Sequence, residues 1–174
     1  LALALLTFIP AILFLFYESK SKIETNLEYT GRSYIELILQ PRFIQAIAAS
    51  AFGYAIMTFL MTATPISMHV MENMSLNKTS IVIQFHVAAM FLPSLLTGHL
   101  IKKFGHSNII YAGVFLYSIT LIASIFEQSF FNYMFALIFL GLGWNFLFIS
   151  GTSLLVLTYK EEEKYKAQGM NDFV

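Results

Sequence analysis

The sequence predicts an all-α membrane protein, a polytopic bundle of transmembrane helices, and three observations support this. Hydrophobic residues make up 57% of the chain and charged residues only 11%, whereas soluble domains carry roughly 25% charged residues. The apolar residues form long runs of the length that crosses a bilayer, about 20 residues each. Short polar or basic segments separate these runs, and their charges are so unevenly distributed that an orientation can be assigned.

The chain begins with an apolar run, residues 1–17, that resembles the end of a membrane-spanning helix in composition. It lacks the basic segment of a signal peptide, so we expect the sequence to be a piece of a longer membrane protein. A polar, charged segment over residues 18–41 is too long for a tight turn. Its SYIELILQ stretch forms either a solvated linker or a short interfacial helix. Five residues would then be available to lipid: Tyr34, Ile35, Leu37, Ile38 and Leu39.

The second apolar run, residues 42–68, has one face of small residues that would let another helix approach closely. Small side chains recur there at intervals of three and four, at Ala46, Ala49, Ser50 and Gly53. An adjacent stripe consists of Tyr54, Met57, Thr58, Met61 and Thr62. Met and Tyr at this spacing serve either packing or a binding site, and the residues alone leave both open.

Three further apolar runs cover residues 80–100, 109–126 and 130–157. In the first of them Pro93 lies in the middle, and His86 is an ionisable group well inside the run. Polar groups in hydrocarbon are costly and usually face protein or water. The His86 imidazole is therefore either hydrogen-bonded to a hydroxyl or carbonyl of a neighbouring helix, or it has a proton-linked or solute-contacting role.

The last of these runs contains the sequence GLGWNFLFISGT, whose glycines Gly141, Gly143 and Gly151 allow close helix approach or flexing. Its Trp144 and Asn145 place a large aromatic ring and an amide side by side in the middle of an apolar run. This pair is a candidate binding site. A simple interhelical hydrogen bond from Asn145 is the alternative.

Positive charge is concentrated in alternate loops. Nine of the ten Lys and Arg residues lie in or next to three segments, which are residues 18–42, the hairpin with Lys102 and Lys103, and residues 158–174. The remaining cation, Lys78, lies between two other runs. If five spans each cross once, the positive-inside rule places the three basic segments in the cytoplasm. In the last segment, the run Glu161–Glu163 is interpreted as a solvated helix start because lysines flank it.

Several classes of function are disfavoured. The absence of Cys removes disulfides, thiolate metal sites and cysteine nucleophiles, and a formal net charge of +0 gives no basic field for nucleic acid. The sequence has no H-E-x-x-H, no G-x-S-x-G, no P-loop and no dinucleotide fingerprint. We therefore expect no enzyme activity, no catalytic residue, no metal site and no cofactor.

The basic hairpin, GHLIKKFGH, resembles the cytoplasmic signature of the major facilitator superfamily, G-x-L-x-D-R-x-G-R. Gly98, Leu100 and Gly105 match the signature, and Lys103 and His106 stand at its basic positions. Lys102 occupies its acidic position. The stretches FLMTATPISMH, FHVAAMFLPSLLTGHLIKKFG, GLGWNFLFISGTSLL and EEEKYKAQGMNDF resemble a bacterial branch of the superfamily that includes proposed riboflavin carriers.

This resemblance implies a partial major facilitator fold. Residues 1–17 would be the end of helix 6, residues 18–41 the central cytoplasmic loop, and residues 42–157 helices 7–10. Residues 158–174 would be a cytoplasmic loop and the start of helix 11. The N-terminal half and the last helices of the same protein would be partners of this part, in the lipid bilayer of a bacterial inner membrane.

The resemblance also implies a secondary active transporter that moves a small organic solute, riboflavin-like in the branch named above, by alternating access. One wall of its central site would be formed by Tyr54, Met57, Met61, His86, Met90, Trp144 and Asn145, with His86, Trp144 and Asn145 on one concave surface. Proton coupling would use His86 or an acid in the other half. The alternatives are a non-transporting membrane sensor or subunit, and an inactive truncated carrier.

Overall fold

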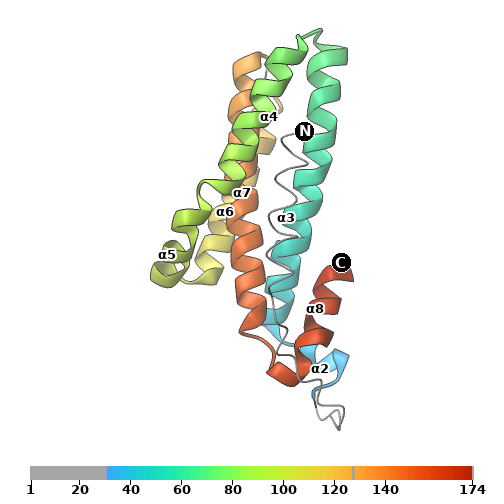
Figure 1. Cartoon of the computed structure of the whole chain (residues 1–174), viewed down its shortest axis with the longest axis vertical. Coiled ribbons are helices and arrows are strands. Elements are labelled where there is room, and N and C mark those ends of the chain that lie inside the picture. The colour runs from blue at the N-terminus through green and yellow to red at the C-terminus, as the bar shows by residue number, and fades with distance from the viewer. Residues whose placement is uncertain (1–30, 127, 174) are drawn as a thin grey trace, which may run out of the picture. The chain divides into compact units, whose positions relative to one another are not determined.

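The structure, a computed structural model, describes residues 31–126 and 128–173, and the regular elements of this part of the chain are all helices (Figure 1). The predicted first span and most of the linker after it lie outside the described residues. The elements are α2 (Tyr34–Ile38), α3 (Pro41–Ile66), the π-helical turn η1 (Ser67–Met71), α4 (Leu76–Phe91), α5 (Ser94–Phe104), α6 (His106–Ala123), α7 (Phe130–Val156), the 3₁₀ turn η2 (Glu161–Glu163) and α8 (Lys164–Phe173).

The four predicted spans within the described residues each have a counterpart. Three segments are long and apolar enough to cross a membrane by themselves, namely α3 with η1, α6, and α7. The third predicted span is two helices, because α4 and α5 meet at a bend of 41° and satisfy the same test only together. Pro93 explains the break, since it has no N–H for the helical ladder. The turn from η1 to α4 lies at one end of these helices, and the α5–α6 corner lies toward the other (Figure 1).

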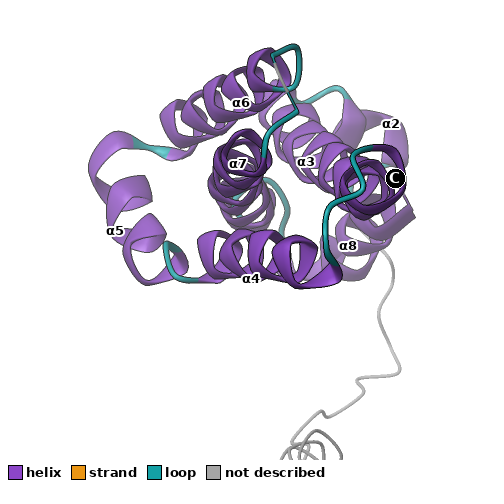
Figure 2. Ribbon diagram, turned by 90° about the horizontal axis from the view of Figure 1, so that it is seen from above, coloured by secondary structure: helices purple, strands orange, loops and turns teal. Residues whose placement is uncertain are grey.

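Helix α7 occupies the centre, with α3, α4 and α6 around it (Figure 2). Its three glycines each face a different neighbour. A Cβ on Gly141 would lie 2.7 Å from the His86 carbonyl oxygen in α4. A Cβ on Gly143 would lie 2.5 Å from the Tyr117 ring in α6, and one on Gly151 would lie 2.6 Å from a side-chain oxygen of α3. The predicted close approach of helices at these glycines is confirmed.

The predicted small face of α3 is buried against α7. Ala46, Ala49, Ser50 and Gly53 are all buried, and a Cβ on Gly53 would lie 3.1 Å from Leu147 of α7. Small side chains on both helices let dispersion contacts form between the two backbones, which is how helices associate in lipid without a hydrophobic driving force.

The short helix α2 begins with a capping box, in which the Ser33 side chain accepts from the Glu36 backbone N–H and the Glu36 carboxylate accepts from the Ser33 N–H. Tyr34, Ile35, Ile38 and Leu39 are exposed, as the interfacial interpretation requires. The inclusion of Leu37 among the lipid-accessible residues was wrong, because Leu37 is fully buried in the core. Leu37 is the position of this single-turn helix that faces the protein, and its apolar side chain anchors α2 to the core.

We predict that Gly141→Ala lowers the melting temperature of the purified protein in detergent. The added methyl would lie 2.7 Å from a backbone carbonyl, which cannot yield as a flexible side chain can, and overpacking of this kind costs about 1–3 kcal/mol. Gly98→Ala is the matched control, because nothing lies within 4 Å of its Cβ position. An unchanged melting temperature for Gly141→Ala would contradict the packing described here.

Candidate functional site

The break between α4 and α5 brings buried polar groups of three helices together. In a continuous helix the Met90 carbonyl would accept the N–H of the residue four positions later. Here the side-chain Nδ2 of Asn145, on α7, donates to that carbonyl at 2.6 Å. Asn145 also donates to Ser94 Oγ at 2.7 Å, and its Oδ1 accepts from Thr97 Oγ1 at 2.6 Å. Asn145 and Thr97 are both fully buried, so this α7 side chain bridges the end of α4 and the start of α5.

His86 lies on α4 one turn before Met90, in contact with α7, and is fully buried. Its Nδ1 is 2.8 Å from the Leu137 carbonyl oxygen. Because a carbonyl can only accept, Nδ1 must carry the hydrogen, which leaves Nε2 as an acceptor. That Nε2 has no hydrogen-bond partner among the described residues. The contact to a neighbouring helix's carbonyl, one of the two predicted alternatives, is therefore present, and one ring nitrogen remains able to take a proton.

An aromatic row lies beside the amide. The Trp144 ring stacks on Phe148, with centroids 4.8 Å apart and planes 9° apart, and meets Phe91 edge-on at 6.2 Å. Trp144 is buried, but the Phe91 side chain is 60% exposed. Tyr54 on α3 is 56% exposed and lines a cavity of ≈ 320 Å³ together with Phe148 and Asp172. Aromatic surface with a few polar groups is the usual lining of an organic-ligand site.

The predicted binding residues fall into two groups. His86, Met90, Trp144 and Asn145 lie at the contact of α4 with α7, where the structure brings them together, and all four are buried. Tyr54, Met57 and Met61 lie on α3, with both Met side chains half-buried against the core. Another cavity, of ≈ 370 Å³, lies near η1 and the start of α7 and contains none of these residues.

Sequence reasoning missed Ser94, Thr97 and Phe148. Two signals were available for them. A proline inside an apolar run frees backbone carbonyls that need a polar donor, so the hydroxyls directly after Pro93 deserved notice. Phe148 follows Trp144 at the i, i+4 spacing at which aromatic side chains meet on a helix.

The signature hairpin is a sharp corner. Gly98, Leu100, Lys102 and Lys103 belong to α5, and His106 is the first residue of α6. Only Gly105 separates the two helices, with a φ of 84°, a conformation that glycine adopts without steric cost. His106 Nε2 lies 3.1 Å from Ser153 Oγ of α7, which ties the corner to the central helix.

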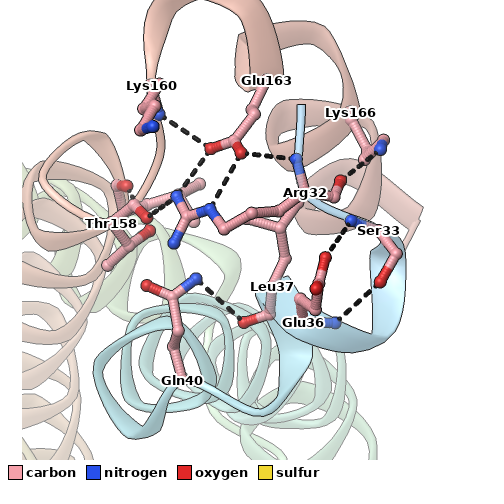
Figure 3. Close-up of polar contacts among 10 residues, drawn as sticks. Arg32, Ser33, Glu36, Leu37, Gln40, Thr158, Lys160, Glu163 and Lys166 are labelled. Atoms are coloured by element: carbon pink, nitrogen blue, oxygen red, sulfur yellow. Dashed lines mark hydrogen bonds and ion pairs between the residues drawn. The ribbon is translucent and has the colours of Figure 1, made fainter. Parts of the chain in front are cut away.

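A second polar cluster lies where the linker meets the segment after α7 (Figure 3). The Arg32 side chain binds Glu163 through two hydrogen bonds, from Nε at 2.8 Å and from Nη2 at 2.6 Å, and Nη2 also donates to the Thr158 carbonyl. The Arg32 backbone N–H donates to Glu163, and its carbonyl accepts from Lys166 Nζ at 2.6 Å. We call this set the linker clamp.

Glu163 was wrongly interpreted as part of a solvated run. Its side chain is 1% exposed, whereas Glu161, two residues earlier, is 87% exposed. The hydrogen bonds from the Arg32 guanidinium hold the pKa of the Glu163 carboxyl well below its usual range, and the backbone N–H groups of Lys160 and Arg32 act in the same direction. The same pairing raises the pKa of Arg32. Both charges are therefore kept at every physiological pH.

Comparison with known proteins gives a consistent result. A family model described as the Major Facilitator Superfamily matches residues 1–174. The chain is 41% identical over 164 residues to the riboflavin transporter RfnT of Brucella anthropi, covering 94% of this chain and 41% of that protein. It is 39% identical over 120 residues to YddS of Bacillus subtilis, an uncharacterized MFS-type transporter, covering 67% of this chain and 27% of that protein. YdeG of the same species is similar to the same extent, over 119 residues.

The chain thus spans 41% of the length of the first of these relatives and 27% of each of the other two. No solved structure matches it.

We predict that Glu163→Gln destabilises the protein by about 1–2 kcal/mol. Losing a buried partner costs more than this, but the Arg32 side chain is 34% exposed and solvent screens its charge. Since the folded-state pKa is lowered, the loss should be constant from pH 8 to about 5. It should shrink as the pH falls below 4.5, the ordinary value for this carboxyl. Melting curves of both proteins, recorded from pH 8 to below pH 4.5, measure this loss of stability.

Glu161→Gln is the control for this measurement, because its pair with Lys164 is exposed and 3.4 Å long. We expect no measurable change from it. Equal effects of the two substitutions would contradict a specific role for the linker clamp.

Proposed function

The chain belongs to the major facilitator superfamily, and from this premise we propose that it forms part of a secondary active transporter for a small organic solute. Transporters of this class expose a central site alternately to the two sides of the membrane. Residues 42–157 would be helices 7–10 of the C-terminal half, after the end of helix 6 (1–17) and the central loop (18–41). Residues 158–174 would lead into helix 11. A bacterial plasma membrane is the proposed location.

The observation that carries this proposal is the row formed by Phe91, Trp144 and Phe148 next to a polar break in a membrane helix. Flat aromatic faces stack on planar rings, and such contacts are worth about 0.5–1.5 kcal/mol beyond area burial. The exposed Phe91 and Tyr54 rings would reach the solute first. The methionines Met57, Met61 and Met90 would supply adaptable apolar surface. Riboflavin, the solute in the name of one relative, has the planar aromatic system that this wall would accept.

We place His86 and Asn145 behind this wall, because both are fully buried. In the proposed cycle His86 is the proton-linked group, since protonation of its Nε2, which has no partner within the described part of the chain, would put a charge inside the protein. Such a charge is tolerated only in a conformation that gives it a partner or water, which would link the proton to the conformational change.

We predict that Trp144→Ala raises the KM for riboflavin uptake about 2- to 10-fold, the loss expected for one aromatic contact. Trp144→Phe should retain most of the affinity. The measurement is uptake of labelled riboflavin into proteoliposomes that contain the intact carrier. Phe135→Leu is the control, because it changes an exposed aromatic residue of α7 that lies outside the proposed wall. Binding of riboflavin without uptake would instead support a sensor or subunit. The absence of both binding and uptake would exclude a flavin as the solute.

We predict that His86→Gln removes the dependence of uptake on an imposed pH gradient and leaves solute exchange between loaded vesicles intact. Glutamine can donate to the Leu137 carbonyl but cannot take up a proton near neutral pH. His69→Gln is the matched control, since His69 is an exposed histidine whose Nδ1 also lies 2.8 Å from a backbone carbonyl. If His86→Gln keeps the gradient dependence, the coupling group is elsewhere in the carrier.

A further inference from the structure

We infer that Asn145 is a positioning residue, whose carboxamide replaces the helical hydrogen bonding interrupted at Pro93 and fixes the angle between α4 and α5. This deepens the proposed function, because it assigns Asn145 to the support of the solute wall and not to solute contact. The inference rests on the proposed function only in its consequences for transport. Its geometric basis is independent of any solute.

The Met90 carbonyl lies at the point where the helical ladder is interrupted. A backbone acceptor without a partner in the membrane interior costs several kcal/mol, and no water is present there to supply a bond. Pro93 cannot continue the ladder, and the chain turns by 41° around it. The Asn145 Nδ2 group donates to the Met90 carbonyl at 2.6 Å, so a side chain of the central helix takes the place of the Ser94 N–H, which would be the donor in a continuous helix.

The Asn145 carboxamide also forms hydrogen bonds with the start of α5. Its Nδ2 group also donates to Ser94 Oγ and its Oδ1 accepts from Thr97 Oγ1, and both residues belong to the first turn of α5. A carboxamide has two N–H groups and two acceptor lone pairs. Both N–H groups and one lone pair are therefore used within the protein, and the side chain is fully buried. A solute could gain a strong bond to Asn145 only by displacing one of these partners.

The bend joins the aromatic wall at the end of α4 to the basic corner at the end of α5. Phe91 is the last residue of α4 and places its ring against Trp144, while α5 leads to the corner at Gly105. The angle between α4 and α5 therefore determines both how Phe91 lies on the wall and where the basic corner stands. Asn145 is next to Trp144 on α7, so one helix holds both the wall and its support.

The test is a double-mutant cycle on the intact protein in detergent, with no solute present. Asn145→Leu should lower the melting temperature by several degrees. In the Pro93→Ala background the N–H of residue 94 can return to the Met90 carbonyl, so the same substitution should cost roughly half as much. Because no solute is involved, failure of the carrier hypothesis would not affect the outcome.

Two controls complete the experiment. Asn132→Leu removes another α7 carboxamide that donates to a carbonyl, that of Ala123 at 2.8 Å, and its effect should be additive with Pro93→Ala. Thr97→Val is the milder variant if Asn145→Leu does not fold, and its loss should also be smaller in the Pro93→Ala background. Additivity of Asn145→Leu with Pro93→Ala would overturn the inference. So would an unchanged melting temperature for Asn145→Leu in the unmodified background.

Discussion

Backbone hydrogen bonding without water is the constraint on which the arrangement of these helices depends. Helices α6 and α7 satisfy it internally, because each forms an uninterrupted ladder across its apolar length, and α3 does so up to Pro65 in its last turn. The pair α4 and α5 cannot, since Pro93 interrupts it. The break is compatible with a membrane only because α7 presents Asn145 at the same depth, with Ser94 and Thr97 completing the set of bonds. The polar residues at the centre of the candidate site therefore have a structural role first, because they satisfy the hydrogen bonding of the interrupted helix.

Close packing around α7 depends on the absence of side chains as much as on their presence. Three glycines on one helix let three neighbours approach within distances that a Cβ would not permit. Lipid tails are as apolar as the helix surfaces, so short backbone separations, and not hydrophobic burial, hold such helices together. This packing places His86 and Asn145 out of reach of solvent. It leaves the aromatic residues Phe91 and Tyr54 at the surface, where a solute or the other half of the protein would contact them.

Much of this arrangement could be predicted from the sequence. Hydropathy located the four spans within the described residues, and the three- and four-residue spacing of small side chains identified the packed face of α3. The division of the third span into two helices was not predicted, although Pro93 was visible, because membrane helices often accommodate a proline without breaking. The acceptor for His86 could not be foreseen either, since a backbone carbonyl such as that of Leu137 has no sequence signature.

The burial of Glu163 and Leu37 shows another limit of prediction from the sequence. Leu37 is one of five neighbouring apolar residues of which the other four are exposed, and Glu163 lies in a charged run, so the composition of neither segment indicates the buried residue. Arg32 and Glu163 are separated by 131 positions, so no periodicity in either segment indicates their pairing.

The length of α4 has a consequence for biosynthesis. Sixteen residues rise only about 24 Å at 1.5 Å per residue, which is short of the roughly 30 Å hydrocarbon core. The translocation machinery therefore has to accept the segments before and after Pro93 as one unit, in spite of the bend. A nascent chain that ended within α5 would hold an α4 too short to stay across the bilayer, so the insertion of this span would depend on the completion of α5.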